Sequence, residues 1–319
     1  MSTVQQEVDE RTNLTGSNKF ELLLFRLGGD AVGDRSELFG INVFKVREIV
    51  AMPVITAVAG ALPHNLGVVN LRGQIIPVID LPSVVGCKPK TGLNIMLVTE
   101  YARSTQGFAV ESVEEIVRLD WSQVLSAEAS AGGGMVTSIA RLDGDREDTR
   151  LAQVLDVEQI LRLISPVNSK EIDPETIGAK LIIKPGSVIL AADDSAVARG
   201  LIEQALTAIG APFIMTKTGK EAWERLQAIS VMAQAEGKTI KDKVAMVLTD
   251  LEMPEMDGFT LTRNIKQDER FKGLPVVIHS SLSGTTNEEH VKSVGADAYV
   301  AKFVAEDLAA TIRRVVGSS

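Results

Sequence analysis

The chain has 319 residues, enough for about two domains of ordinary size. Hydrophobic residues make up 45% of it and charged residues 24%, a composition that excludes a mainly disordered or repetitive chain. The 33 lysines and arginines are outnumbered by 42 aspartates and glutamates, giving a net charge of −9, so the sequence predicts no basic surface for nucleic acid.

Cys87 is the only cysteine, which excludes a disulfide framework and a thiolate zinc site and favours a reducing compartment. Residues 1–17 are polar and acidic, unlike a signal peptide, and are predicted to form a disordered tail. The longest apolar run, residues 49–62, contains Pro53 and is shorter than the ~20 residues that span a bilayer. We therefore expect a cytoplasmic protein that does not insert into a membrane.

Residues 18–165 contain short apolar runs that are separated by Gly, Pro, Asn and Asp. This pattern is typical of an all-β barrel or sandwich, and helical periodicity is confined to a stretch that ends near residues 157–161. The apolar side chains expected in the core include Leu71, Ile75, Ile76, Val78 and Ile79. A polar stretch rich in helix and strand breakers follows, and residues 166–186 are predicted to be a linker.

Residues 187–319 alternate between short apolar runs and amphipathic stretches. Between Val197 and Ile209 the apolar residues recur at helical spacing, and this stretch follows the apolar run 187–192. Further apolar runs occupy residues 244–248, 275–278 and 298–301. The alternation predicts a doubly wound α/β domain whose strands form a parallel sheet.

Reactive side chains follow several of the predicted parallel strands. Asp193 and Asp194 follow the run 187–192, and Asp250 lies just after the run 244–248. Ser280 lies at the end of the strand that contains 275–278, and Lys302 follows the run 298–301. Ligands bind at the carboxyl ends of strands in such sheets, so we expect these groups to gather at one edge. Clustered carboxylates suit Mg²⁺, and a carboxylate can accept a phosphoryl group whose oxygens are bound by a lysine and a hydroxyl.

The segments 192–195, 248–259 and 298–302 resemble the two-component receiver family in residue type, order and spacing. The resemblance implies that Asp250 is phosphorylated and that Ser280 and Lys302 contact the phosphoryl group. It also implies that Tyr299 is the aromatic residue that repositions on activation.

The same resemblance implies a magnesium site formed by Asp193, Asp194, Asp250 and the backbone carbonyl of Glu252. The sequence departs from the family pattern in having Phe303, not proline, after Lys302, which predicts a trans peptide bond or a differently shaped loop there.

In the front half, the segments 38–41, 46–49 and 67–81 resemble the CheW family of chemotaxis coupling proteins. The resemblance covers residues 18–165 and implies a pair of small five-stranded β-barrels without enzymatic activity. It implies two partners, the methyl-accepting chemoreceptors and the histidine kinase CheA. A CheW-like domain (18–165) joined to a receiver domain (187–319) is the arrangement of CheV-type coupling proteins.

Arg72 is the candidate partner-binding residue of the front half, together with Glu48. A guanidinium next to Gly73 is costly to bury without a partner, and arginine is enriched at binding hot spots. The alternative is an intramolecular ion pair of Arg72 with Glu48 or Asp80. No catalytic constellation precedes residue 165 in the sequence, and His64 is expected to have a structural or surface role.

These features predict a non-enzymatic adaptor that couples chemoreceptors to CheA at membrane receptor arrays and is regulated by phosphorylation of Asp250. Two alternatives stay open: the receiver domain acts as a phosphate sink for the kinase, or the protein is a passive scaffold with a phosphate-independent receiver. A response regulator with an enzymatic output would need a catalytic cluster in the front half.

Overall fold

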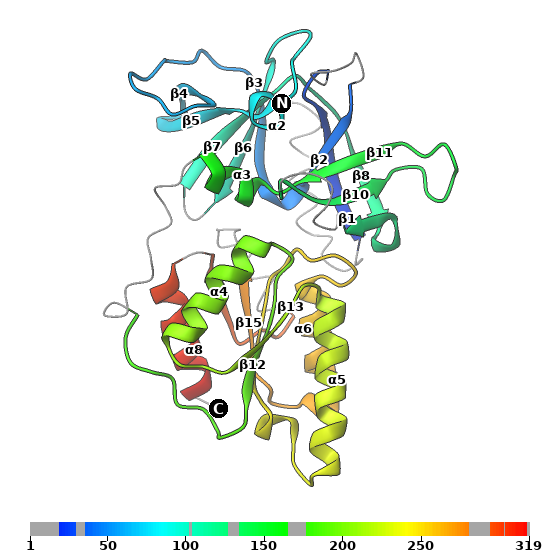
Figure 1. The fold of residues 1–319 in the computed structure, drawn as a ribbon, viewed down its shortest axis with the longest axis vertical. Coiled ribbons are helices and arrows are strands. Elements are labelled where there is room, and N and C mark those ends of the chain that lie inside the picture. The colour runs from blue at the N-terminus through cyan, green and yellow to red at the C-terminus, as the bar shows by residue number, and fades with distance from the viewer. Residues whose placement is uncertain are drawn as a thin grey trace. The chain divides into compact units, whose positions relative to one another are not determined.

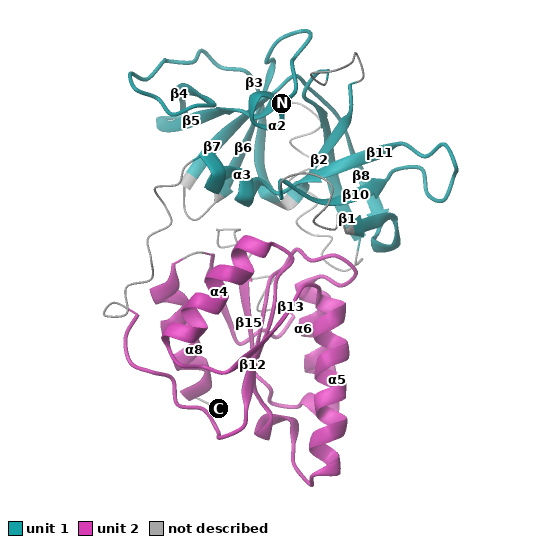
Figure 2. Ribbon diagram, viewed as in Figure 1, with its two compact units in different colours: residues 1–169 teal, residues 170–319 magenta. Residues whose placement is uncertain are grey.

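The computed structural model describes residues 19–29, 36–101, 104–126, 134–164, 177–280, 294–302 and 304–317. The chain divides into two compact units, residues 1–169 and residues 170–319 (Figure 2). The predicted tail, the first half of the predicted linker and Phe303 lie outside the described residues.

The first unit is built on two β-sheets (Figure 1). The strands of the larger sheet are β1 (Lys19–Arg26), β2 (Leu38–Asn42), β8 (Ser112–Asp120), β9 (Val124–Ser126), β10 (Val136–Arg141) and β11 (Leu151–Leu155). They lie in the order β8-β1-β2-β11-β10-β9. All neighbours in this sheet are antiparallel except β2 and β11, which are parallel.

The strands of the second sheet are β3 (Val46–Ala51), β4 (Asn65–Leu71), β5 (Gln74–Asp80), β6 (Ile95–Tyr101) and β7 (Ser104–Val110). Their order is β3-β6-β7-β5-β4, with β5 and β7 parallel and the other neighbours antiparallel. The helical segments of this unit are η1 (Val43–Lys45), α2 (Leu81–Val85), η2 (Trp121–Gln123) and α3 (Val157–Ile164).

The all-β front half is therefore confirmed, with one difference in strand number from the two five-stranded β-barrels that the resemblance implies. The larger sheet has six strands, because the short strand β9 pairs with β10 at its edge. The main core of the unit takes side chains from both sheets and from α3. Strand β1 is buried on both faces, since Leu23 and Phe25 enter this core while Leu22 and Leu24 enter a second cluster. This explains the uninterrupted apolar run at residues 22–25.

The expected core position of Ile75 is wrong. Its side chain is 62% exposed, whereas Ile76, Val78 and Ile79 are buried and Leu71 packs at the border of a core cluster. Side chains alternate between the two faces of a strand, and near the start of β5 only the face of Ile76 is covered.

The second unit is a five-stranded parallel sheet with helices on both faces (Figure 1). Its strands are β12 (Val188–Ala192), β13 (Phe213–Thr216), β14 (Val244–Thr249), β15 (Val276–Ser280) and β16 (Ala298–Ala301). The described helical segments are α4 (Ala196–Ala208), α5 (Gly219–Ala235), η4 (Ile240–Asp242), α6 (Gly258–Gln267), η5 (Glu269–Phe271) and α8 (Ala305–Gly317). The strand order is β13-β12-β14-β15-β16 and all neighbours are parallel.

The two faces of this parallel sheet have separate apolar cores. Helices α4 and α8 pack on one face, where Ile189 and Ala191 point, and α5 and α6 pack on the other, where Leu190 points. The predicted doubly wound α/β domain is confirmed. Its order places the crevice for ligands at the carboxyl ends of β12 and β14, where successive connections leave toward opposite faces.

The described part of the predicted linker, residues 177–186, packs against the α/β unit. Ile177 is buried in the cluster that contains α4 and α8. The guanidinium of Arg313 on α8 donates to the backbone carbonyls of Ile177 and Ala179, and Leu181 N donates to Ile209 O at the end of α4 (2.7 Å). This segment is thus anchored to both helices.

Across the described parts of both units, none of the helices combines the length and the apolar character that crossing a membrane requires.

Candidate functional site

Four charged side chains follow the carboxyl ends of three parallel strands. Asp193 and Asp194 follow β12, Asp250 follows β14, and Lys302 follows β16. The carboxyl ends of β12 and β14 lie side by side, because Ala192 pairs with Thr249 and Asp250 N donates to Ala192 O at 2.9 Å. Parallel pairing therefore brings residues that are far apart in the sequence to one edge of the sheet, as predicted.

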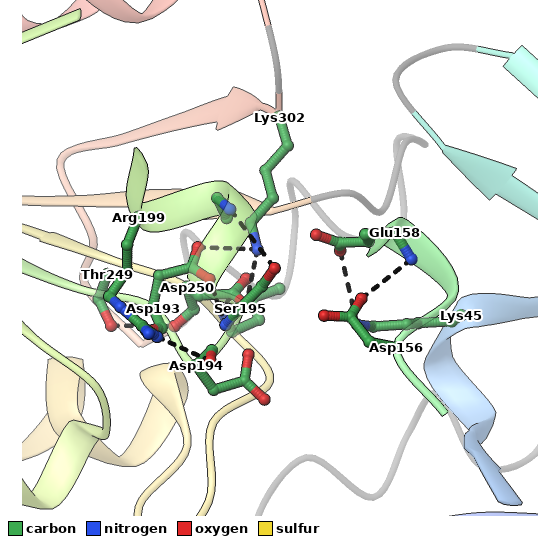
Figure 3. A network of polar contacts seen from close by, with 12 residues as sticks. Lys45, Asp156, Glu158, Asp193, Asp194, Ser195, Arg199, Thr249, Asp250 and Lys302 are labelled. Atoms are coloured by element: carbon green, nitrogen blue, oxygen red, sulfur yellow. Dashed lines mark hydrogen bonds and ion pairs between the residues drawn. The ribbon is translucent and has the colours of Figure 1, made fainter. Parts of the chain in front are cut away.

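Lys302 bridges two of the aspartates (Figure 3). Its Nζ lies 2.9 Å from Asp193 Oδ2 and 2.8 Å from Asp250 Oδ2. The side chains are almost fully withdrawn from water, with exposed fractions of 1% for Lys302, 0% for Asp193 and 3% for Asp250. Buried charges are strongly destabilising unless they are paired, so the lysine offsets part of the repulsion between the carboxylates.

Backbone amides hold the aspartates in place as well. Ser195 N donates to Asp193 Oδ1 at 3.0 Å, and Leu251 N donates to Asp250 Oδ1 at 2.8 Å. Each of these two carboxylates thus has one oxygen bound by a main-chain N–H and the other bound by Lys302. Their orientation is set by the turns at the strand ends, not by side-chain packing alone.

One side chain that contacts this turn, Arg199 on α4, is not among the site residues predicted from the sequence. Its Nη1 donates to the backbone carbonyls of Asp193 (2.9 Å) and Asp194 (2.7 Å), as Figure 3 shows. A long side chain in a helix points back toward the helix N-terminus, so an arginine at the end of the first turn can reach the residues before the helix. That geometric rule is the one sequence signal that points to it.

The loop after Asp250 leaves no room for a side chain at Gly258. A Cβ at this position would lie 2.0 Å from the backbone oxygen of Asp250. Gly258 N also donates to Leu251 O (2.9 Å), and the preceding Asp257 caps α6 by accepting from Thr260 N (2.6 Å). Burial raises the pKa of the Asp257 carboxyl above its usual value. The close approach of α6 to the Asp250 loop explains the Asp-Gly pair in the motif.

The other predicted site residues lie near this cluster. Ser280 is buried at the end of β15, and its backbone oxygen accepts from Lys302 N at 2.8 Å. Tyr299 on β16 packs in a small apolar cluster with Leu251 and Ile278. Glu252 is two residues beyond Asp250, and its side chain is 8% exposed.

The acidic residues fit a divalent cation. Asp193, Asp194 and Asp250 each offer a carboxylate oxygen, and these oxygens all lie within 4.8 Å of one another. Mg²⁺ prefers oxygen ligands and commonly binds through a few carboxylates while keeping several waters. One ammonium cannot balance three carboxylates, so the donor set and its charge both suit a hard cation.

In the first unit, Arg72 and Glu48 form an ion pair. Arg72 Nη2 lies 2.6 Å from Glu48 Oε1. Arg72 lies at the tip of the β4–β5 hairpin with φ +51°, and Gly73 beside it has φ +88°. Left-handed conformations at both central positions are typical of a tight type I′ hairpin turn, where arginine is an unusual residue. The intramolecular pair with Glu48, one of the two alternatives for Arg72, is thus present.

Among the residues that the structure describes, His64 contacts a serine but no acid that would complete a catalytic triad. Its Nδ1 lies 2.9 Å from Ser83 Oγ, and its backbone oxygen accepts from Asp80 N (2.8 Å). The Asp80 carboxylate accepts instead from Ser83 N at 3.0 Å, where it caps α2. These bonds connect the loop before β4 to α2, which is the structural role expected for His64.

Comparison with known proteins covers both units. The CheW-like domain family matches residues 21–165, and the response regulator receiver domain family matches residues 189–313. The chain is 30% identical to Chemotaxis protein CheV3 of Helicobacter pylori over 94% of this chain and 95% of that protein. It is 29% identical to Chemotaxis protein CheV2 of the same species, over 93% and 95%.

Among solved structures, the scaffolding protein TtCheW from Thermoanaerobacter tengcongensis is 25% identical, with a TM-score of 0.39, over 48% of this chain and 97% of that chain. The CheV relatives, in contrast, match nearly the whole of this chain, 94% and 93% of its length. Both domain families are present in the predicted order, and the chain belongs to the CheV family of chemotaxis coupling proteins.

Proposed function

We propose that this protein is a non-enzymatic adaptor that couples methyl-accepting chemoreceptors to the histidine kinase CheA, and that phosphorylation of Asp250 regulates the coupling. The observation that best supports the proposal is the contact of one buried lysine, Lys302, with both Asp250 and Asp193. A potential phosphoryl acceptor, a group that can bind the transferred oxygens and a set of cation ligands thereby occupy one site.

The transfer itself requires little beyond positioning and charge neutralisation. A carboxylate oxygen of Asp250 attacks the phosphorus of a phosphohistidine on the kinase. A P–O bond forms as the P–N bond breaks, and the imidazole that leaves takes up a proton. Asp193, Asp194, Asp250 and the backbone carbonyl of Glu252 would hold Mg²⁺, which when bound supplies positive charge against the phosphoryl oxygens.

Two further residues would respond to the phosphorylated state. Lys302 would pair with a phosphoryl oxygen instead of sharing its ammonium between two carboxylates, and Ser280 would donate its hydroxyl to another oxygen. Movement at Ser280, at the end of β15, would open space for Tyr299 on the neighbouring strand. Both strands belong to one sheet, so a change at the acceptor would reach its edge at β16.

In the CheW-like unit, Arg72 and Glu48 would form part of the partner-binding surface. A residue other than glycine in a left-handed conformation is strained, and such strain concentrates at functional positions. The Arg72 side chain is also well exposed although it is paired, so a partner can reach it. The protein would act in the cytoplasm, at arrays of membrane chemoreceptors.

The test is phosphotransfer from labelled CheA to the wild-type chain and to Asp250→Asn, with and without Mg²⁺. We expect label only on the wild-type protein and only with the cation. Kinase activity in a reconstituted receptor–kinase complex is then measured with each protein, in the presence of phosphodonor. A change in activity that needs Asp250 supports regulation.

Two other outcomes would favour the alternatives. Transfer of the label from CheA to Asp250 without any change in kinase activity would indicate that the receiver domain is a phosphate sink. Coupling by a chain that accepts no phosphate at all would indicate a passive scaffold.

A further inference from the structure

One charged group beside the acidic cluster has no part in the proposed phosphotransfer, the guanidinium of Arg199. It contacts neither a carboxylate of the site nor any group that would react. Instead, Nη1 donates to two consecutive backbone carbonyls, those of Asp193 and Asp194 (2.9 and 2.7 Å). These are the two residues that, under the proposed function, supply ligands to the cation.

The turn that carries the two aspartates is held from several directions. Ser195 N donates to the Asp193 carboxylate, and the Ser195 hydroxyl caps α4 by accepting from Ala198 N. Arg199 N in turn donates to Ser195 O at 3.0 Å. The guanidinium therefore joins the first turn of α4 to the main chain on the opposite side of Ser195.

This contact affects geometry more than it affects net charge. Carbonyl oxygens that accept from a charged donor make stronger hydrogen bonds than neutral pairs do. The two carbonyls belong to the peptide planes that follow Asp193 and Asp194, so holding them restrains the backbone from which both carboxylates project. Groups that orient metal ligands from outside contribute substantially to affinity, typically ten- to a hundredfold. The positive charge by itself would act in the other direction, because it repels a divalent cation.

We propose that Arg199 is a positioning residue for the cation site: by binding the carbonyls of Asp193 and Asp194 it orients their carboxylates for a divalent ion. The proposal rests on the proposed magnesium site. This positioning effect of Arg199 on cation affinity can be distinguished from the effect of its charge and from its contribution to folding stability.

The experiment is a calorimetric titration of the full chain with Mg²⁺, in the absence of phosphodonor, combined with melting curves with and without the cation. Arg199→Lys keeps the charge but loses the planar donor that spans two carbonyls, and Arg199→Gln also loses the charge. We expect both variants to bind Mg²⁺ about tenfold more weakly than wild type and to show a smaller rise in melting temperature on adding it.

Arg313→Gln is a matched control. Arg313 also binds two backbone carbonyls with its guanidinium, but on the segment that bonds to the far end of α4 at Ile209. Its loss should lower the melting temperature equally with and without Mg²⁺ and leave the affinity unchanged.

Three results would overturn the proposal. Tighter binding by Arg199→Gln with unchanged binding by Arg199→Lys would assign only an electrostatic effect to this residue. A fall in melting temperature with unchanged affinity in both variants would make its role purely structural. If Asp194→Asn also bound Mg²⁺ as wild type does, the cation site of the proposed function would itself be wrong, and the role of Arg199 with it.

Discussion

The ion pairs at the two candidate sites of this chain differ in how far water reaches them. In the receiver unit, Lys302 and its partners Asp193 and Asp250 are at most 3% exposed. In the CheW-like unit, the Arg72 side chain is 71% exposed and its partner Glu48 is 9% exposed. Buried charges must be balanced within the fold, whereas an ion pair that water reaches from one side, like that of Arg72, is partly screened and contributes less, typically about 0–1 kcal/mol when it is exposed.

The difference separates two uses of charge. The buried cluster combines three carboxylates with the ammonium of Lys302, so its charge balance would change if a cation or a phosphoryl group entered, as the proposed function requires. The exposed arginine adds little to folding, yet it occupies a strained turn position. Under the proposed function, partner binding explains its presence there. Four variants test this comparison, beginning with the largest expected effect on the free energy of unfolding.

Lys302→Met should be the most damaging. It leaves buried carboxylates without their counter-charge, and removing one partner of a buried ion pair typically costs about 3–5 kcal/mol. Urea unfolding in the presence of a chelator measures the loss, and adding Mg²⁺ should restore part of it. Lys220→Met is the control, because Lys220 is an exposed lysine paired with Glu255 at 3.3 Å, and it should change stability by less than about 0.5 kcal/mol. Equal effects of the two variants would contradict the view of a balanced buried cluster.

Gly258→Ala should come next. Its Cβ would press against the backbone oxygen of Asp250, so the loop must shift, at about 1–3 kcal/mol, and phosphoryl acceptance should slow. Gly200→Ala in α4 is the control, since beyond the adjoining backbone of its own helix no described atom lies within 4 Å of its added Cβ, and alanine favours helix by roughly 0.5–1 kcal/mol. Thermal unfolding should therefore move in opposite directions for the two variants.

His279→Leu should produce an effect that depends on pH. Burial, together with the nearby Lys302 ammonium, lowers the pKa of His279 well below its usual value. The unfolded chain therefore binds a proton below pH ~6.5 that the folded chain does not, and wild-type stability falls as pH decreases. Relative to wild type, the free energy of unfolding of the leucine variant should rise by up to about 1.4 kcal/mol for each pH unit below pH ~6.5. A difference between the two proteins that stays constant from pH 8 to pH 5 would exclude this role.

Arg72→Ala should have the smallest effect on folding and a clear effect on binding. Because the guanidinium itself is 71% exposed, loss of its pair with Glu48 should cost about 1 kcal/mol in urea unfolding. Affinity for the receptor–kinase complex, followed by co-sedimentation with receptor-containing membranes, should fall about tenfold. Arg150→Ala, which removes a similarly exposed arginine paired with Asp143 at 3.1 Å, should leave binding unchanged. Equal binding by wild type and Arg72→Ala would remove Arg72 from the partner surface.

Much of the receiver unit could be predicted because its pattern is local. Each apolar run followed by an acid or a lysine marks the end of a buried parallel strand, and parallel pairing sends all such ends to one edge. This pairing predicts that Asp193, Asp194, Asp250 and Lys302 lie together. It does not predict which carboxylates Lys302 contacts, because that depends on the register between β16 and β15.

The front unit was less predictable in its details. Its β character follows from short apolar runs, but which face of a strand is covered depends on neighbours distant in the sequence. Ile75 shows this, because the apolar run 75–79 does not reveal that one side of the hairpin lies open to water.

The sequence by itself determined the two fold classes, their order and the set of charged groups at the strand ends, because these depend on periodicity and on residue types next to each strand. Tertiary structure alone decided the partners: Glu48 for Arg72, two carboxylates for Lys302, and two main-chain carbonyls for Arg199. The physical reason is that hydrogen bonds and ion pairs act over about 3 Å. At that range, the register of strands and the rotation of a helix select one partner among several that the sequence allows.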